Sequence, residues 1–99
     1  MSHRIYISGK ITGNPNYMKE FAAAEELLKK TYPDADIINP AKISAMLPAS
    51  LTHDEYMRFC YLELELCTSV LFLKNWRNSY GSNQERGYAI ARDMIILEE

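Results

Sequence analysis

The stretch VLFLKNWRNSYGSNQE, residues 70–85, places an apolar strand directly before a polar turn and the start of a helix. Ser79, Gly81 and Glu85 all follow the carboxyl end of that strand, which is where open α/β sheets hold their ligands. Glycine lets the backbone approach a ligand closely, and the first turn of a helix offers free N–H groups to an anion. The stretch therefore predicts a strand–turn–helix unit that carries a ligand site. In the alternative, Ser79 is a plain helix N-cap and Glu85 is its capping-box partner or a solvated residue.

Strand-like runs alternate with helical runs along the whole chain. We expect strands at residues 4–8, 36–39, 69–73 and 94–97, and helices at residues 17–30, 53–67 and 81–92. Thr52, followed three residues later by Glu55, has the capping-box pattern of a helix start, and residues 41–52 are irregular or weakly helical. Alternation without hairpins predicts a three-layer α/β fold of the flavodoxin or Rossmann type, with a four-stranded parallel sheet between helices.

The expected strand order is 2-1-3-4, by analogy with this fold class. The order reverses between strands one and three, and ligands bind at such a switch point. The loops that follow these two strands are the glycine-containing loop at residues 9–14 and the segment at residues 74–81. We therefore expect both loops to border one crevice.

The composition restricts the class of protein. Ninety-nine residues, 47% of them hydrophobic and 24% charged, fit a single domain at residues 1–99. The net charge of −2 argues against a binder of duplex nucleic acid, which needs a basic face. No apolar run is long enough to span a bilayer, and no secretory segment is recognisable at the N-terminus, so we expect a cytoplasmic protein that makes no use of a membrane.

The two cysteines point to a reduced protein without metal. Cys60 and Cys67 lie about two helical turns apart, roughly 10 Å along one helix, which is too far for a disulfide. No histidine stands at metal-ligand spacing from either cysteine, so we expect no zinc. Nothing in the sequence calls for a cofactor.

The helix at residues 53–67 has two apolar faces. One consists of Met57, Cys60, Tyr61 and Leu64, and the other of Phe59, Leu62 and Leu66. A surface helix needs only one such face for the core. We expect the second face to pack on another copy of the chain, as a homodimer or larger assembly; in the alternative it lies under the loop at residues 41–52.

Several motifs, taken together and in order, resemble the nucleoside 2-deoxyribosyltransferase superfamily. They are YISGKITG at residues 6–13, the turn Pro40-Ala41, Trp76, and the pattern S-x-G-x-x-x-E-x-x-x-A at residues 79–89. The chain looks closest to a small, uncharacterised branch that is common in phages and their bacterial hosts. The resemblance covers nearly the whole chain.

The resemblance implies cleavage or transfer at the N-glycosidic bond of a nucleoside or nucleotide. In the family a glutamate attacks the anomeric carbon of deoxyribose and forms a glycosyl-enzyme, which water or a second base resolves. Glu85 matches that glutamate, and Tyr6 matches the family tyrosine that orients it. Both are therefore expected to be catalytic.

The residue at position 79 bears on the substrate. Transferases of the family that act on free nucleosides tend to carry aspartate there, whereas the hydrolases of 2′-deoxynucleoside 5′-monophosphates carry serine, as Ser79 does here. A hydroxyl and backbone N–H groups donate to phosphate, while a carboxylate repels it. The resemblance thus favours a nucleotide. The residues expected to contact substrate or phosphate are Ser8, Gly9, Lys10, Ile11, Trp76, Ser79 and Gly81; Trp76 either stacks on the base or only covers the crevice.

The sequence departs from the family at two carboxylates. Cys60 stands where active members have an aspartate that positions the nucleophile and handles the proton of the leaving base, and Thr68 stands where they have a second aspartate. Losing such a group commonly costs about 10²–10⁴-fold in rate. The alternative function is therefore a nucleotide- or nucleotide-sugar-binding module that has lost the acid.

Overall fold

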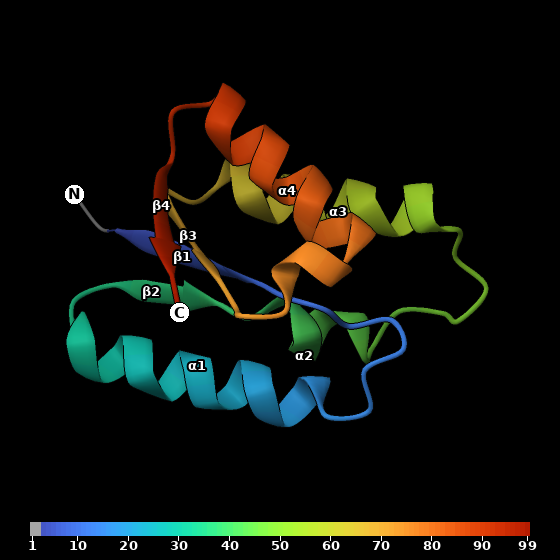
Figure 1. The fold of residues 1–99 in the computed structure, drawn as a ribbon, viewed down its shortest axis with the longest axis horizontal. Coiled ribbons are helices and arrows are strands. Elements are labelled where there is room, and N and C mark those ends of the chain that lie inside the picture. The colour runs from blue at the N-terminus through green and yellow to red at the C-terminus, as the bar shows by residue number, and fades with distance from the viewer. Residues whose placement is uncertain (1–2) are drawn as a thin grey trace.

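The computed structural model describes residues 3–99 as four strands and four helices (Figure 1). The strands are β1 (Arg4–Ser8), β2 (Asp36–Ile38), β3 (Ser69–Phe72) and β4 (Ile95–Glu98). The helices are α1 (Tyr17–Thr31), α2 (Pro40–Ser44), α3 (His53–Glu65) and α4 (Tyr80–Ala91), with a short 3-10 turn at Trp76–Asn78. No helix among residues 3–99 is long and apolar enough to cross a membrane.

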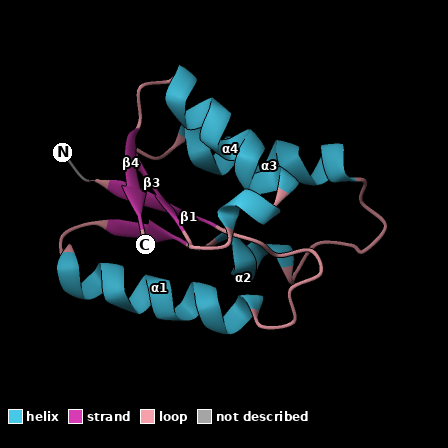
Figure 2. Cartoon of the chain, in the orientation of Figure 1, coloured by secondary structure: helices cyan, strands magenta, loops and turns pink. Residues whose placement is uncertain are grey.

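The strands form one parallel sheet in the order β2-β1-β3-β4, which confirms the expected topology. Figure 2 shows α1 and α2 on one face of the sheet and α3 and α4 on the other. The order reverses between β1 and β3, so the loops after these two strands lie at the same edge of the sheet.

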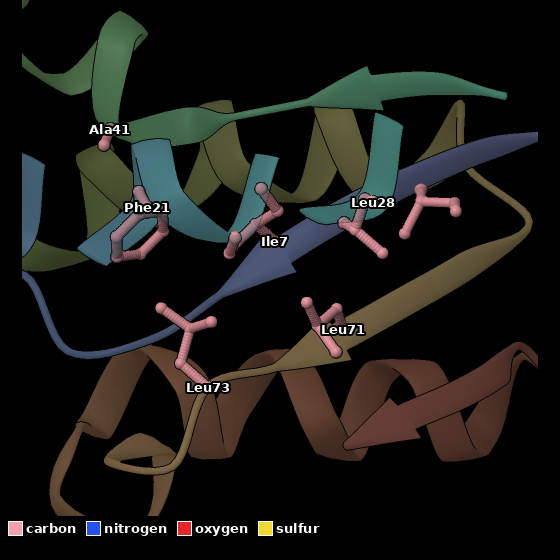
Figure 3. Packing of buried hydrophobic residues seen from close by; sticks show 8 residues of the cluster. Ile7, Phe21, Leu28, Ala41, Leu71 and Leu73 are labelled. Atoms are coloured by element: carbon pink, nitrogen blue, oxygen red, sulfur yellow. The ribbon is translucent and has the colours of Figure 1, made fainter. Parts of the chain in front are cut away.

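Alternate residues of the central strands feed two separate cores, as the two-residue period of a strand requires. The core on the α1 side is shown in Figure 3 and consists of Ile5, Ile7, Phe21, Ala24, Leu28, Ala41, Leu71 and Leu73. The core on the α3–α4 side consists of Tyr6, Leu64, Val70, Phe72 and Ala89. Tyr6 is thus the one polar-tipped aromatic in the buried set of the second core.

Two local features differ from the sequence-based expectation. Pro40–Ser44 forms a short helix, because Pro40 is placed at its first turn and the Asn39 side chain accepts a hydrogen bond from the Ala41 N–H at 3.0 Å. Residues 74–79, expected as a plain loop, contain the 3-10 turn. The remaining ends shift by one or two residues, which is the usual uncertainty at helix and strand termini.

The caps of α3 and α4 position the ends of both helices. Thr52 Oγ1 accepts from the Glu55 N–H at 3.1 Å and Glu55 Oε1 accepts from the Thr52 N–H at 2.9 Å, which confirms the capping box. Ser79 Oγ accepts from the Ser82 N–H at 3.1 Å, so Ser79 is an N-cap. Glu85 is not its partner, because its carboxylate bonds elsewhere.

A buried carboxylate joins α1 to the segment after β2. Glu25 lies 2.8 Å from Lys29 Nζ and 3.0 Å from Lys42 Nζ, and it accepts from Asn39 Nδ2 at 3.0 Å. Burial alone would raise its pKa, but the hydrogen bonds from Lys29, Asn39 and Lys42 together lower the pKa of Glu25 to about 2.

This cluster makes stability depend on acid. Glu25→Gln should lower the free energy of unfolding at pH 7 by about 1–3 kcal/mol, because it removes a charged acceptor from three donors. A glutamate pKa near 4.3 in the unfolded chain and about 2 in the folded chain means that the wild type loses this advantage as the pH falls from about 5 to 2. Urea unfolding at pH 7 and at pH 3 measures it: the difference between the two proteins should shrink at pH 3. The exposed neighbour variant Glu26→Gln is the control and should be near wild type at both values.

Candidate functional site

A cavity lies where the loop after β1 meets the first turns of α3 and α4. It is lined by Tyr6, Ile7, Gly9, Ile11, Thr12, Phe21, Pro40, His53, Tyr56, Met57, Cys60, Ser79, Gly81, Ser82 and Glu85. Its volume is about 40 Å³, which is enough to hold ordered water but far below the roughly 300–1,000 Å³ of pockets that hold small-molecule ligands. The two loops expected to share a crevice therefore do so.

Glu85 is held from two strand positions. Its Oε2 accepts a hydrogen bond from the Tyr6 hydroxyl at 2.5 Å, and its Oε1 accepts one from the Ser8 hydroxyl at 2.7 Å. Glu85 is only 5% exposed. Burial raises the pKa of Glu85 to about 7, against the opposing effect of the hydrogen bonds from Ser8 and Tyr6. The site thus holds an oriented carboxylate that changes its charge near neutral pH.

Tyr6 acts as a fixed donor. It is fully buried, and burial, followed by the charge of Glu85, raises the pKa of its phenol well above the usual 10. The phenol therefore keeps its proton, so that its only role toward Glu85 is to donate. The Tyr6 hydroxyl thus restricts the orientation of the Glu85 carboxylate.

The two serines around Glu85 have different positions. Ser8 is buried behind the carboxylate and does not line the cavity, so it supports Glu85 and has no access to a ligand. Ser8 Oγ also lies 3.0 Å from Ser82 Oγ. Ser82 lines the cavity, and sequence reasoning missed it; its position three residues before Glu85, on the same helix face, was the available signal.

Cys60 lies in the cavity wall as a neutral thiol. It is 2% exposed, and burial, followed by the charge of Glu85, raises the pKa of Cys60 to about 12. Tyr56, one turn earlier on α3, also lines the cavity, and its hydroxyl lies 2.5 Å from Ser44 Oγ. Within residues 3–99 no carboxylate besides Glu85 lines the cavity. The position expected for an acid is therefore filled by a group that holds its proton tightly.

The first loop contributes backbone and apolar atoms. Gly9 and Ile11 line the cavity, as expected, but Lys10 does not. The Lys10 backbone N–H donates to Asn75 Oδ1 at 3.1 Å, which ties this loop to the one after β3. A Cβ on Gly9 would lie 2.7 Å from Leu73 Cδ1, so only glycine allows the loop to approach β3 this closely.

Trp76 lies away from the cavity. Its ring packs edge-on against Phe72, and the guanidinium groups of Arg77 and Arg86 each lie 4.7 Å from its centroid. Trp76 is therefore a packing residue among cationic neighbours. Neither the base-stacking nor the covering role expected for it fits this position.

His53 is a further lining residue that the sequence analysis did not select. It is the first residue of α3, and its ring lies at the mouth of the cavity beside Gly81 and Met57. A histidine at a helix start has no sequence signal of its own. Only the crossing of α3 and α4 brings it to the site.

The comparison with protein families gives one match. A family model described as "Domain of unknown function (DUF4406)" matches residues 3–98. The chain belongs to the DUF4406 family. Neither a curated protein nor a solved structure matches it. The family description names no activity.

Burial of Glu85 should cost stability at high pH. Its pKa is about 7 in the folded chain and near 4.3 in the unfolded chain, so the folded state is increasingly penalised as the pH rises from about 4 to 7. Glu85→Gln keeps the shape without the charge. At pH 8 its free energy of unfolding should exceed that of wild type by about 1–3 kcal/mol, so it should unfold at a higher temperature. This difference should vanish near pH 4.

Thermal unfolding followed by circular dichroism at both pH values tests this. Glu65→Gln, at an exposed position on α3, is the matched control and should show no pH-dependent difference from wild type. A Glu85→Gln protein that is less stable than wild type at pH 8 would contradict the cost assigned to the buried charge.

Proposed function

We propose that the cavity cleaves or transfers the N-glycosidic bond of a deoxynucleoside or its 5′-monophosphate, with Glu85 as nucleophile. The observation that carries this proposal is the buried Glu85 carboxylate, which lines the cavity and is oriented by the hydroxyls of Tyr6 and Ser8. The resemblance of residues 6–13 and 79–89 to the deoxyribosyltransferase superfamily supports it.

The chemistry follows the logic of a retaining glycosidase. A Glu85 carboxylate oxygen forms a bond to the anomeric carbon as the bond to the base nitrogen breaks, and the base leaves with that electron pair and takes up a proton. Water or a second base then attacks the same carbon and releases the carboxylate. The transition state resembles an oxocarbenium ion, so a fixed negative charge stabilises it. Tyr6 contributes by holding the carboxylate in one orientation.

Cys60 limits the reaction. A leaving base needs a proton, and a thiol whose pKa is about 12 is a poor acid at neutral pH. Turnover is therefore slow, and bases that must be protonated to leave are the poorest substrates. The second candidate function, a module that binds nucleotides or nucleotide sugars without cleaving them, is favoured by the same absence of an acid from the lining residues.

We also propose that the chain forms a homodimer or larger assembly in a reducing compartment. Phe59, Leu62 and Leu66 are 42%, 62% and 58% exposed, so the loop before α3 leaves them uncovered. A homodimer or larger assembly through this face of α3 would bury them. The free thiols of Cys60 and Cys67 fit a reducing compartment such as the cytoplasm. The ligand is a small molecule, and neither a membrane nor duplex nucleic acid is involved.

The decisive experiment incubates the protein with deoxynucleosides and their 5′-monophosphates and measures free base by chromatography. Wild type should release base from at least one substrate, and Glu85→Gln should reduce release below detection because the amide cannot attack. Cys60→Asp should raise the rate by about 10²-fold or more, because a carboxyl beside Glu85 keeps its proton near neutral pH and can donate it.

The pH profile gives a second readout of the same nucleophile. The reaction needs the ionised Glu85, whose pKa is about 7, so kcat/KM should fall as the pH drops below 7 and level off above it. An unchanged rate in Glu85→Gln would overturn the nucleophile assignment. If neither wild type nor Cys60→Asp cleaves any substrate, while nucleotides bind, the binding-module function is correct.

The assembly has its own test. Phe59→Asp places a charge in the centre of the proposed interface, which should convert a dimer into a monomer in sedimentation velocity at micromolar concentration. Leu27→Asp, at an apolar position on α1 that is 57% exposed, is the control and should leave the assembly unchanged. A wild-type protein that sediments as a monomer contradicts the proposal.

A further inference from the structure

His53 and Gln84 connect α3 and α4 across the mouth of the cavity. His53 Nε2 lies 2.7 Å from Gln84 Oε1. A carbonyl oxygen can only accept, so Nε2 carries the proton and donates. His53 Cε1 lies 3.9 Å from the position that a Cβ on Gly81 would occupy, which places the ring directly over the first turn of α4.

Glu85 is the fixed carboxylate of the cavity wall, and the other lining residues do little to balance its negative charge. Among residues 3–99, no lysine or arginine lines the cavity, and the Lys10 side chain is not part of its wall. Glu85 becomes negative near neutral pH, so an anionic ligand needs a hydrogen-bond donor on the side away from it. His53 lines the cavity, and its Nε2–H group is a donor that a phosphate oxygen can accept from.

The same two residues are the ones that a ligand can displace. The cavity volume of about 40 Å³ is far below the roughly 300–1,000 Å³ of pockets that hold small-molecule ligands, so a sugar enters only if exposed side chains at its edge move. Tyr6 and Glu85 are buried and bonded to each other, whereas His53 and Gln84 are both exposed. An exposed hydrogen bond contributes little, because water replaces it when it breaks.

We infer that His53 determines specificity for a phosphate monoester on the ligand: its ring turns from Gln84 and donates a hydrogen bond to a phosphate oxygen of a nucleoside 5′-monophosphate. Gln84 competes with the phosphate for the same donor. The inference rests on the proposed function, because it assigns the phosphate end of that substrate to a residue outside the S-x-G motif.

Substitutions of His53 and of Gln84 should then change the affinity for the monophosphate in opposite directions. Binding is measured by calorimetry in a Glu85→Gln background, which prevents turnover, with 2′-deoxyadenosine and its 5′-monophosphate, and with the corresponding pairs for the other three bases. His53→Ala should weaken binding of the monophosphate about tenfold or more and change nucleoside affinity less than about twofold. Gln84→Met, which keeps the length and removes the acceptor, should tighten monophosphate binding about two- to tenfold.

Two further variants separate recognition from folding. His53→Lys supplies a different N–H donor at the same position and should recover most of the preference for the monophosphate. His3→Ala removes the other described histidine, whose ring lies against Thr68 and does not line the cavity, and should change neither affinity. Repeating the His53→Ala measurement without the Glu85 substitution shows whether the background matters.

The outcomes are distinct. If His53→Ala leaves the ratio of monophosphate to nucleoside affinity unchanged, or if His53→Ala and Gln84→Met both weaken binding, the inference is overturned. If wild type releases base equally from nucleosides and monophosphates, the proposed function stands and the inference fails. If neither kind of ligand binds or reacts, both fail.

Discussion

The hydrogen bonds from Tyr6 and Ser8 to Glu85 are the contacts on which the site depends. They join the central strand β1 to helix α4, two elements that are nearly eighty residues apart in sequence. Because both donors lie on the same face of β1, they fix both oxygens of one carboxylate. The carboxylate thus lies at the carboxyl end of the sheet, beside the loop that begins at Gly9.

The buried Glu85 carboxylate lowers the stability of the fold and is the nucleophile of the proposed reaction. The buried Glu85 carboxylate opposes folding whenever it is charged, yet only the charged form can attack carbon. Burial places the pKa of Glu85 near 7, where both forms coexist. The raised pKa of the Cys60 thiol shows the other consequence of the same apolar surroundings: a group beside Glu85 retains its proton and gives it up reluctantly.

Much of the fold was predictable because local and long-range signals agree. The apolar runs around Ile5 and Val70, the Thr52–Glu55 capping box and the alternation of strands with helices all indicate one parallel sheet. Ser79, Gly81 and Glu85 were found because they share a motif whose spacing is local, and Tyr6 was found through the resemblance of residues 6–13 to the deoxyribosyltransferase superfamily. The short helix at Pro40–Ser44 was expected only as a weakly helical segment, since five residues carry too little periodicity to identify a helix.

The sequence by itself determined the order of the elements and the motif that contains the buried carboxylate, because strand and helix periods and helix caps depend on neighbouring residues. The strand order was expected only by analogy with the fold class. Only the tertiary structure decided which side chains share the cavity. In the structure Ser8 lies beneath Glu85, and the side chains of Lys10 and Trp76 do not line the cavity. The cavity is lined instead by residues that include Ser82, Tyr56 and His53. The reason is geometric: the packing of α3 against α4 and the close approach of Gly9 to Leu73 are set by contacts between distant segments, which no local pattern encodes.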